Sequence, residues 1–166
     1  MKIQSRLVLF IVLCAAIFAA TAETRAQQSS HATAAKSSDA SESDLAAIKQ
    51  TALDYIEGYY EGSADRMERA LHPELAKRIV HTDPKSGRSR LDQMSAMSLV
   101  LGTRARATRP TPKEKRQNDV TVLDVFENAA SVKIVATDWI DYLHVAKFNG
   151  RWVIVNVLWE LKPQQK

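Results

Sequence analysis

The C-terminal stretch 118–161 constrains the fold more than any other part of the sequence. Apolar and polar residues alternate along it and short polar turns interrupt it, which predicts four antiparallel strands joined by tight connections. Asn149 and Gly150 form the strongest hairpin signal in the chain, because these residue types adopt the positive φ angles that a two-residue turn requires. We therefore expect a β-meander whose faces the rest of the chain has to cover.

The last strand of this meander has large apolar side chains on both faces. A strand of this kind is covered on both sides. We expect helices on one face and a further protein surface, most economically a second copy of the chain, on the other. Strict alternation assigns Trp152, Ile154 and Leu158 to one face, and Val153, Val155, Val157 and Trp159 to the other.

The residues before the meander predict the covering helices. Apolar side chains from Leu45 to Tyr59 recur at steps of three and four, which indicates an amphipathic helix that begins near Ser43 and ends at Gly62. A second, short helix is expected over 63–71, because a serine can cap its start and a proline follows its end.

The middle of the chain predicts three further segments. Residues 76–91 read as a strand, a tight turn and a returning strand. A third helix is expected over 93–101, capped by Asp92 and ended by Gly102. Residues 103–117 are rich in Arg and Lys, which indicates a solvated loop or, alternatively, an anion-binding rim. The inward side of the third helix is expected to hold Met94, Met97 and Leu101.

Residues 1–26 have the features of a cleaved secretory signal peptide. Basic residues near the start precede an apolar run over 7–20 and small residues. The run is shorter than the roughly 20 residues that a membrane span needs. Cleavage is expected after Ala22 or after Ala26. We therefore expect a periplasmic or secreted protein that is not attached to a membrane after signal cleavage.

The expected mature chain has a flexible linker over 27–42, rich in Ser and Ala, and one domain over 43–166. Cys14 is the only cysteine and lies in the signal, so the mature protein has no disulfide and no thiol nucleophile. The formal charge is +4, and nearer +2 without Lys2 and Arg6, which is too mild to indicate nucleic acid. Neither a histidine spacing typical of metal sites nor a Gly-rich phosphate loop occurs, so we expect no metal and no cofactor.

Four motifs give the chain a family resemblance: 55–62 (YIEGYYEG), 71–73 (LHP), 141–143 (DYL) and 149–156 (NGRWVIVN). In order and spacing they resemble the nuclear transport factor 2-like superfamily, and most closely its bacterial family named "putative lumazine-binding". The resemblance covers about 43–161. It implies an α+β cone, in which a curved mixed or antiparallel sheet wraps around an N-terminal helix, with a pocket at the open end and dimerisation through the sheet. It implies no particular activity, because the superfamily holds ketosteroid isomerases, SnoaL-like cyclases and dehydratases, and proteins that only bind.

In such a cone the pocket takes its side chains from the inner face of the sheet and from the first helix. The candidate catalytic residues are Asp138, Asp141 and His144, because a carboxylate beside apolar surface is suited to act as a general base. Alternation puts His144 on the face of Asp138 and Asp141 on the opposite face, unless a bulge intervenes, so either aspartate could be the base. Tyr55 and Tyr59 could donate hydrogen bonds to an enolate oxygen, or could simply be core aromatics. The candidate ligand-binding residues are Tyr55, Tyr59, Trp139, Asp141, His144 and Trp152.

Three functions are compatible with this sequence. The leading expectation is a secreted, non-catalytic protein that binds a small apolar or aromatic ligand and forms a homodimer through its sheet. The second is an enzyme of the isomerase or dehydratase kind, with Asp138 or Asp141 as its general base. The third is a protein–protein interaction module whose pocket is closed by its own side chains Trp139, Trp152 and Met97. Pocket volume and the surroundings of the aspartates distinguish the three.

Overall fold

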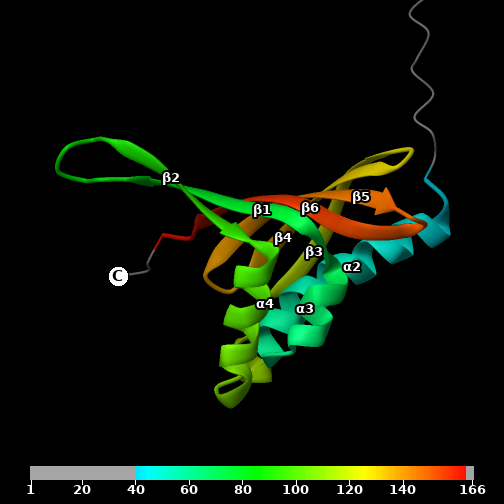
Figure 1. Cartoon of the computed structure of the whole chain (residues 1–166), viewed down its shortest axis with the longest axis horizontal. Helices are drawn as coiled ribbons and strands as arrows, with labels where there is room; N and C mark the ends of the chain where they lie inside the picture. The colour runs from blue at the N-terminus through cyan, green and yellow to red at the C-terminus, as the bar shows by residue number, and fades with distance from the viewer. Residues whose placement is uncertain (1–39, 164–166) are drawn as a thin grey trace, which may run out of the picture. The chain divides into compact units, whose positions relative to one another are not determined.

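The computed structural model describes residues 40–163, all of which belong to the compact unit Ser38–Lys166. Its helices are α2 (Glu42–Glu61), α3 (Ala64–Ala70) and α4 (Ala96–Ala105), followed by the 3-10 turns η1 (Arg106–Thr108) and η2 (Lys113–Lys115). Its strands are β1 (Leu71–Thr82), β2 (Ser89–Ser95), β3 (Asn118–Phe126), β4 (Ala129–Ala136), β5 (Trp139–Phe148) and β6 (Arg151–Leu161) (Figure 1). The expected signal peptide and most of the expected linker lie outside the described residues.

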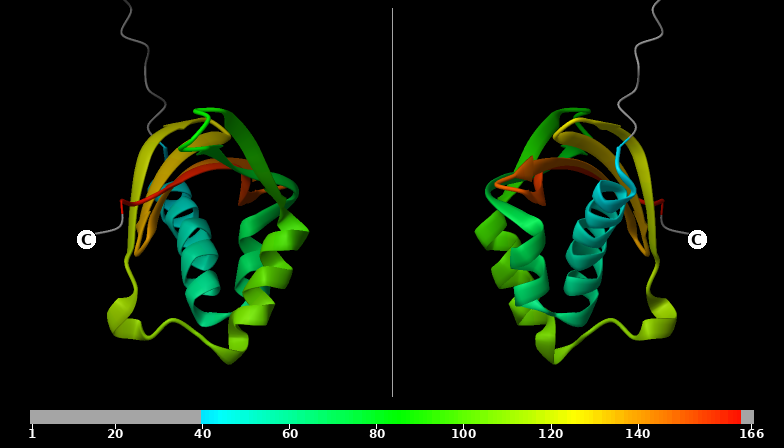
Figure 2. Two further views of the ribbon diagram at one scale, coloured as in Figure 1. Left: turned by 90° about the vertical axis from the view of Figure 1, so that its left-hand side faces the viewer. Right: turned by 90° about the vertical axis from the view of Figure 1, so that its right-hand side faces the viewer.

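The six strands form one mixed sheet in the order β2-β1-β6-β5-β4-β3. Strands β3 to β6 are successive antiparallel neighbours, which confirms the predicted meander. Strand β1 joins β6 in parallel, with Lys77 beside Val157, and β2 pairs antiparallel with β1 at the edge. The sheet is curved and unclosed, and the three helices lie on its concave side (Figure 2). This is the α+β arrangement that the sequence predicted.

Helix α2 has the start and the end that its sequence encodes. The side chain of Ser41 accepts a hydrogen bond from a backbone N–H of the first turn at 3.1 Å, which satisfies one free donor of the helix. Gly62 ends the helix in the left-handed conformation at φ 72°. Ile48, Ala52 and Ile56 are fully buried, so the apolar stripe of the helix packs against the sheet.

The third helix begins later than the sequence predicted. Residues up to Ser95 stay in β2, because the pairing of β2 with β1 continues until Ser95 lies opposite Ala76. The side chain of Ser95, and not that of Asp92, caps α4 by accepting a backbone N–H at 3.2 Å. The helix then continues past Gly102 to Ala105. Long-range strand pairing therefore overrides the local helix signal in 93–95.

The inward side of α4 also differs from the prediction. Met97 and Leu101 are 65% and 52% exposed, whereas Val100 and Thr103 are buried. The face with smaller side chains is the one that packs inward. Met97 consequently does not fill the interior of the cone.

Strand β6 carries a bulge that changes which of its residues face the helices. Two adjacent β5 residues pair with Ile154 and Asn156, so Val155 is left as an extra residue. Beyond this point the two faces of the strand exchange. Leu158 points outward and is 51% exposed, while Trp159 packs against the core. The strict alternation assumed for this strand was therefore wrong after Val155.

Candidate functional site

A buried ion pair lies on the inner face of the sheet. Lys77 of β1 donates a hydrogen bond from Nζ to Oδ1 of Asp141 in β5 at 2.6 Å, across the intervening strand β6. Lys77 is 5% exposed and Asp141 is fully buried. Strand alternation places Lys77 between the buried side chains of Leu75 and Ile79, so an ammonium group stands in an otherwise apolar row. A buried charge of this kind is tolerated only when it is paired.

Aromatic side chains surround this pair. Lys77 Nζ also donates to the hydroxyl of Tyr55 at 2.6 Å, and Trp139 Nε1 donates to the second oxygen of Asp141 at 2.6 Å. The rings of Trp159, Tyr55 and Trp139 have their centroids 4.7, 5.3 and 5.8 Å from Nζ, which is within reach of cation–π attraction. We call Lys77, Asp141, Tyr55, Trp139 and Trp159 the inner cluster.

The environment of the inner cluster shifts two of its pKa values. Burial lowers the pKa of Lys77 below its usual value, and the attraction of Asp141 acts against this. Burial raises the pKa of the Tyr55 hydroxyl well above its usual value, and the negative charge of Asp141 adds to the effect. Tyr55 therefore stays protonated at neutral pH.

At one side the cluster continues to partly exposed residues. The rings of Tyr59 and Trp139 meet edge to face at 5.2 Å, and the guanidinium of Arg106 lies 4.2 Å from the centre of the Tyr59 ring. Three buried side-chain polar atoms have no hydrogen-bond partner within residues 40–163: Thr103 Oγ1, Arg106 Nε and Trp159 Nε1. Buried polar atoms are almost always paired in folded proteins. Because two of the three can only donate, a group that accepts hydrogen bonds would satisfy them.

The structure brings together four of the side chains predicted from the sequence. Tyr55, Tyr59, Trp139 and Asp141 are linked by the contacts given above. Tyr55 and Tyr59 are adjacent because they lie one helical turn apart, and Trp139 and Asp141 because they lie two residues apart in one strand. Of the two candidate aspartates, Asp141 is the one that faces the helices.

The other three predicted residues lie apart from the inner cluster. Asp138 is exposed in the turn before β5, and His144 is exposed with its Nδ1 3.4 Å from Nδ2 of Asn156. Trp152 is buried near the start of α2, where its Nε1 donates to Oδ1 of Asp44 at 2.8 Å. Their roles in catalysis or binding stay predictions.

Sequence reasoning missed Lys77, Trp159 and Arg106 as parts of this region. Lys77 belongs to an alternating segment, and its position in the apolar row of Leu75 and Ile79 was the one available signal. Arg106 was noted only as a member of the basic stretch. Strict alternation placed Trp159 on the face opposite Trp152 and Ile154, because the bulge leaves no mark in the sequence.

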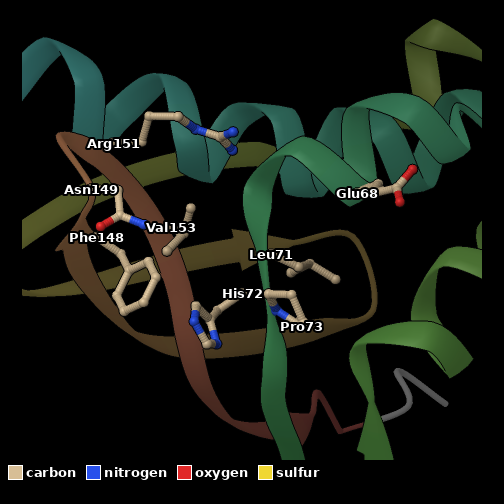
Figure 3. Close-up of a pocket in the computed structure, with 8 residues that line it drawn as sticks. All are labelled: Glu68, Leu71, His72, Pro73, Phe148, Asn149, Arg151 and Val153. Atoms are coloured by element: carbon tan, nitrogen blue, oxygen red, sulfur yellow. The ribbon is translucent and has the colours of Figure 1, made fainter.

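The described residues also form several surface cavities. Lys77, Asp141 and Tyr55 are buried, so the inner cluster is closed to solvent. None of them lines any of four surface cavities of about 340 to 390 Å³. One of them lies at the β5–β6 hairpin (Figure 3). Within residues 40–163, no group of three or more His, Cys, Asp or Glu side chains is placed to hold a metal ion.

Solved structures identify the class of this fold. The chain is similar to an NTF2-like protein of unknown function from Methylobacillus flagellatus, with a TM-score of 0.59 and 18% identity over 75% of this chain and 97% of that one. It is also similar to an NTF-2 like protein of unknown function from Silicibacter pomeroyi, with a TM-score of 0.57 and 16% identity over 72% and 97% of the two chains. The fold is therefore that of the nuclear transport factor 2-like superfamily.

The family follows from the sequence match. Residues 43–160 match the model of the family described as "Putative lumazine-binding", so the chain belongs to this family. Both the superfamily and the family expected from the four motifs are thereby confirmed. No curated protein matches the chain at a significant level.

Proposed function

We propose that the protein binds a small aromatic ligand at the inner cluster and does not catalyse a reaction on it. The observation that carries this proposal is the state of Asp141. Both of its oxygens already accept hydrogen bonds, one from the Lys77 ammonium and one from Trp139. A carboxylate neutralised by a lysine at 2.6 Å is a poor general base, because proton transfer to it has to break the ion pair.

The ligand's chemistry follows from the groups beside the pair. Tyr59 and Trp139 offer partly exposed aromatic surfaces for stacking. The unpartnered Trp159 Nε1 and Arg106 Nε favour a ligand with carbonyl or other acceptor atoms. Because the inner cluster is closed, the ligand would be admitted by displacement of the Tyr59 and Trp139 side chains. The family name supports the same class, since lumazine is a planar heterocycle with carbonyl oxygens.

Lumazine is the first compound to test, by calorimetry and by quenching of tryptophan fluorescence. Arg106→Gln and Trp159→Phe should each weaken its binding about tenfold, because each removes a donor to the ligand. Arg109→Gln, with the same charge change on an exposed residue of the basic stretch, is the matched control. Native mass spectrometry of the protein purified from its own periplasm reports any other bound ligand. Absence of binding by every compound, with no co-purifying ligand, would contradict the proposal and favour an interaction module.

An enzyme of the isomerase or dehydratase kind is the second candidate. The observation in its favour is that Asp141 is fully buried beside Trp139, with the Tyr55 hydroxyl bonded to the same Lys77. Such an enzyme should exchange the protons next to a ketone for deuterium, as NMR can measure. The rate should fall by at least about a hundredfold in Asp141→Asn. Exchange that does not depend on Asp141 excludes this candidate.

We further propose that the protein is exported to the periplasm or secreted, with cleavage after Ala22 or Ala26. The amino-terminal pattern of charge, apolar run and small residues supports this proposal. No helix among residues 40–163 is long and apolar enough to cross a membrane. Amino-terminal sequencing of the protein from fractionated cells tests both the location and the cleavage site.

We also propose that the outer face of the sheet pairs with a second copy of the chain. Exposed apolar side chains lie opposite one another on neighbouring strands there: Leu91 with Val80, and Leu158 with Tyr142. Light scattering should report a dimer, and Leu158→Lys should shift it to a monomer. Leu101→Lys, the same change at an exposed residue of α4 on the concave side of the sheet, is the control. A monomer in the unmodified protein would refute the proposal.

A further inference from the structure

We propose a second binding site, for a small aromatic carboxylate, in the cavity at the end of the β5–β6 hairpin. The cavity has a volume of about 350 Å³ and is formed by the end of α3, the start of β1 and the hairpin (Figure 3). Small-molecule sites have volumes of roughly 300–1,000 Å³. The cavity shares no lining residue with the inner cluster, so this inference does not depend on the function proposed above.

The apolar part of the lining suits an aromatic ring. Leu71 and Val153 are 6% and 5% exposed, and Pro73 and Phe148 complete the apolar surface. Phe148 is 53% exposed, and its ring meets the ring of His72 edge to face at 4.7 Å. A ring bound against Phe148 in the cavity would cover this exposed aromatic surface, which is a favourable change.

The polar part of the lining suits a carboxylate. Arg151 donates from Nη2 to the carbonyl oxygen of Arg69 at 3.0 Å, which holds the side chain in place and uses one of its five N–H donors. Arg151 has no ion-pair partner within residues 40–163, so its charge can be paired by a ligand. His72 Nδ1 accepts the backbone N–H of Glu74 at 3.2 Å, and the neutral ring therefore carries its proton on Nε2 as a further donor.

Two features make the site preorganised and selective. His72 is held by its bond to Glu74 and by its contact with Phe148, and Arg151 is held by the carbonyl of Arg69, so few side chains have to be ordered on binding. Glu68 also lines the cavity, and Figure 3 shows it at a different end of the lining from Arg151. Its negative charge weakens the binding of an anion, so its removal should strengthen binding.

The test compares naphthalene-2-carboxylate with its neutral carboxamide by NMR titration of the whole mature chain. The carboxylate should bind at least about tenfold more tightly than the carboxamide, with shifts at the amides of Gly150 and Val153. Arg151→Gln should abolish this preference, and Glu68→Gln should increase the affinity for the carboxylate. Arg90→Gln, with the same charge change at an exposed residue of β2, should leave the affinity unchanged.

The outcomes separate this site from the inner cluster. Equal binding of the two compounds, or equal effects of Arg151→Gln and Arg90→Gln, overturns the proposal. Shifts at the indole signals of Trp139 and Trp159 in place of the hairpin amides overturn it as well, while they support ligand binding at the inner cluster.

Discussion

The Lys77–Asp141 pair predicts a specific pattern of stabilities in three variants. Lys77→Met leaves the Asp141 carboxylate buried without a counter-charge, and Asp141→Asn leaves the Lys77 ammonium buried without one. Removal of one partner from a buried pair costs about 3–5 kcal/mol. For a domain of this size that lowers Tm by about 10–20 °C. The double variant Lys77→Met/Asp141→Asn leaves no unpaired charge, and it should be closer to the unmodified protein than either single variant.

The pH dependence of Asp141→Asn gives an independent check of the same reasoning. Burial already lowers the pKa of Lys77 from its usual 10.5, and the loss of Asp141 removes the two interactions that raise it. Below pH 10.5 the unfolded chain then binds more protons than the folded chain, so stability rises with pH. Asp141→Asn should accordingly regain more stability than the unmodified protein does as the pH rises toward 10.5.

Urea unfolding followed by far-UV circular dichroism measures all of these variants. Because the double variant should be less destabilised than either single variant, the coupling free energy between Lys77 and Asp141 should exceed the larger single effect of about 3–5 kcal/mol. Two single effects that simply add in the double variant would refute the view that the pair is mutually dependent. If the free energy of unfolding of Asp141→Asn does not change with pH, the destabilisation of this variant does not come from the unpaired Lys77 charge.

Three further perturbations test other parts of the fold. Gly62→Ala should lower the free energy of unfolding by about 2–4 kcal/mol, because φ is +72° and an added Cβ would lie 2.4 Å from the η1 backbone. Gly87→Ala, at φ +69° with open space around it, should lower it by only about 1 kcal/mol. Thermal unfolding measures both variants. Tyr60→Phe should cost about 1–2 kcal/mol, since the Tyr60 hydroxyl bonds the loop before β3 at 2.7 Å and the turn before β5 at 2.9 Å. Lys147→Met should raise the pKa of Asp44 from about 2 in an NMR titration, because the Lys147 ammonium is the main cause of its lowering. The stabilising effect of the Asp44–Lys147 pair is present above pH 3.8 and is lost as the pH falls toward 2. Identical acid unfolding curves for Lys147→Met and the unmodified protein would contradict this effect.

The parts of the fold that the sequence predicted are those set by local patterns. The meander follows from alternation and from the Asn149–Gly150 turn, and α2 follows from its apolar steps and from the serine and glycine at its ends. The start of α4 and the faces of β6 beyond Val155 depend on which residues of distant strands pair. Local patterns do not contain this pairing, so both expectations failed there.

The same distinction applies to the candidate site. Tyr55 and Tyr59 were grouped from helical spacing, and Trp139 and Asp141 from their nearness in one strand. Lys77 could not be added, because it enters the cluster only through the parallel pairing of β1 with β6, and Lys77 and Asp141 are far apart in sequence. The sequence around Lys77 contains a second cation at Arg78, so it resembles a solvated strand edge.

Lys77 also changes which ligands the inner cluster can accept. Its ammonium occupies the space between the Tyr55, Trp139 and Trp159 rings, where a cationic ligand would otherwise be attracted. A positively charged ligand would have to displace Lys77 and leave Asp141 to be paired anew, at the cost of a buried ion pair. A neutral or acceptor-rich aromatic ligand can instead bind beside an intact pair and use the free donors of Arg106 and Trp159. At the proposed binding site the Lys77 cation would thus select against cationic ligands, and Lys77→Met should relax this selection in the same calorimetric assay.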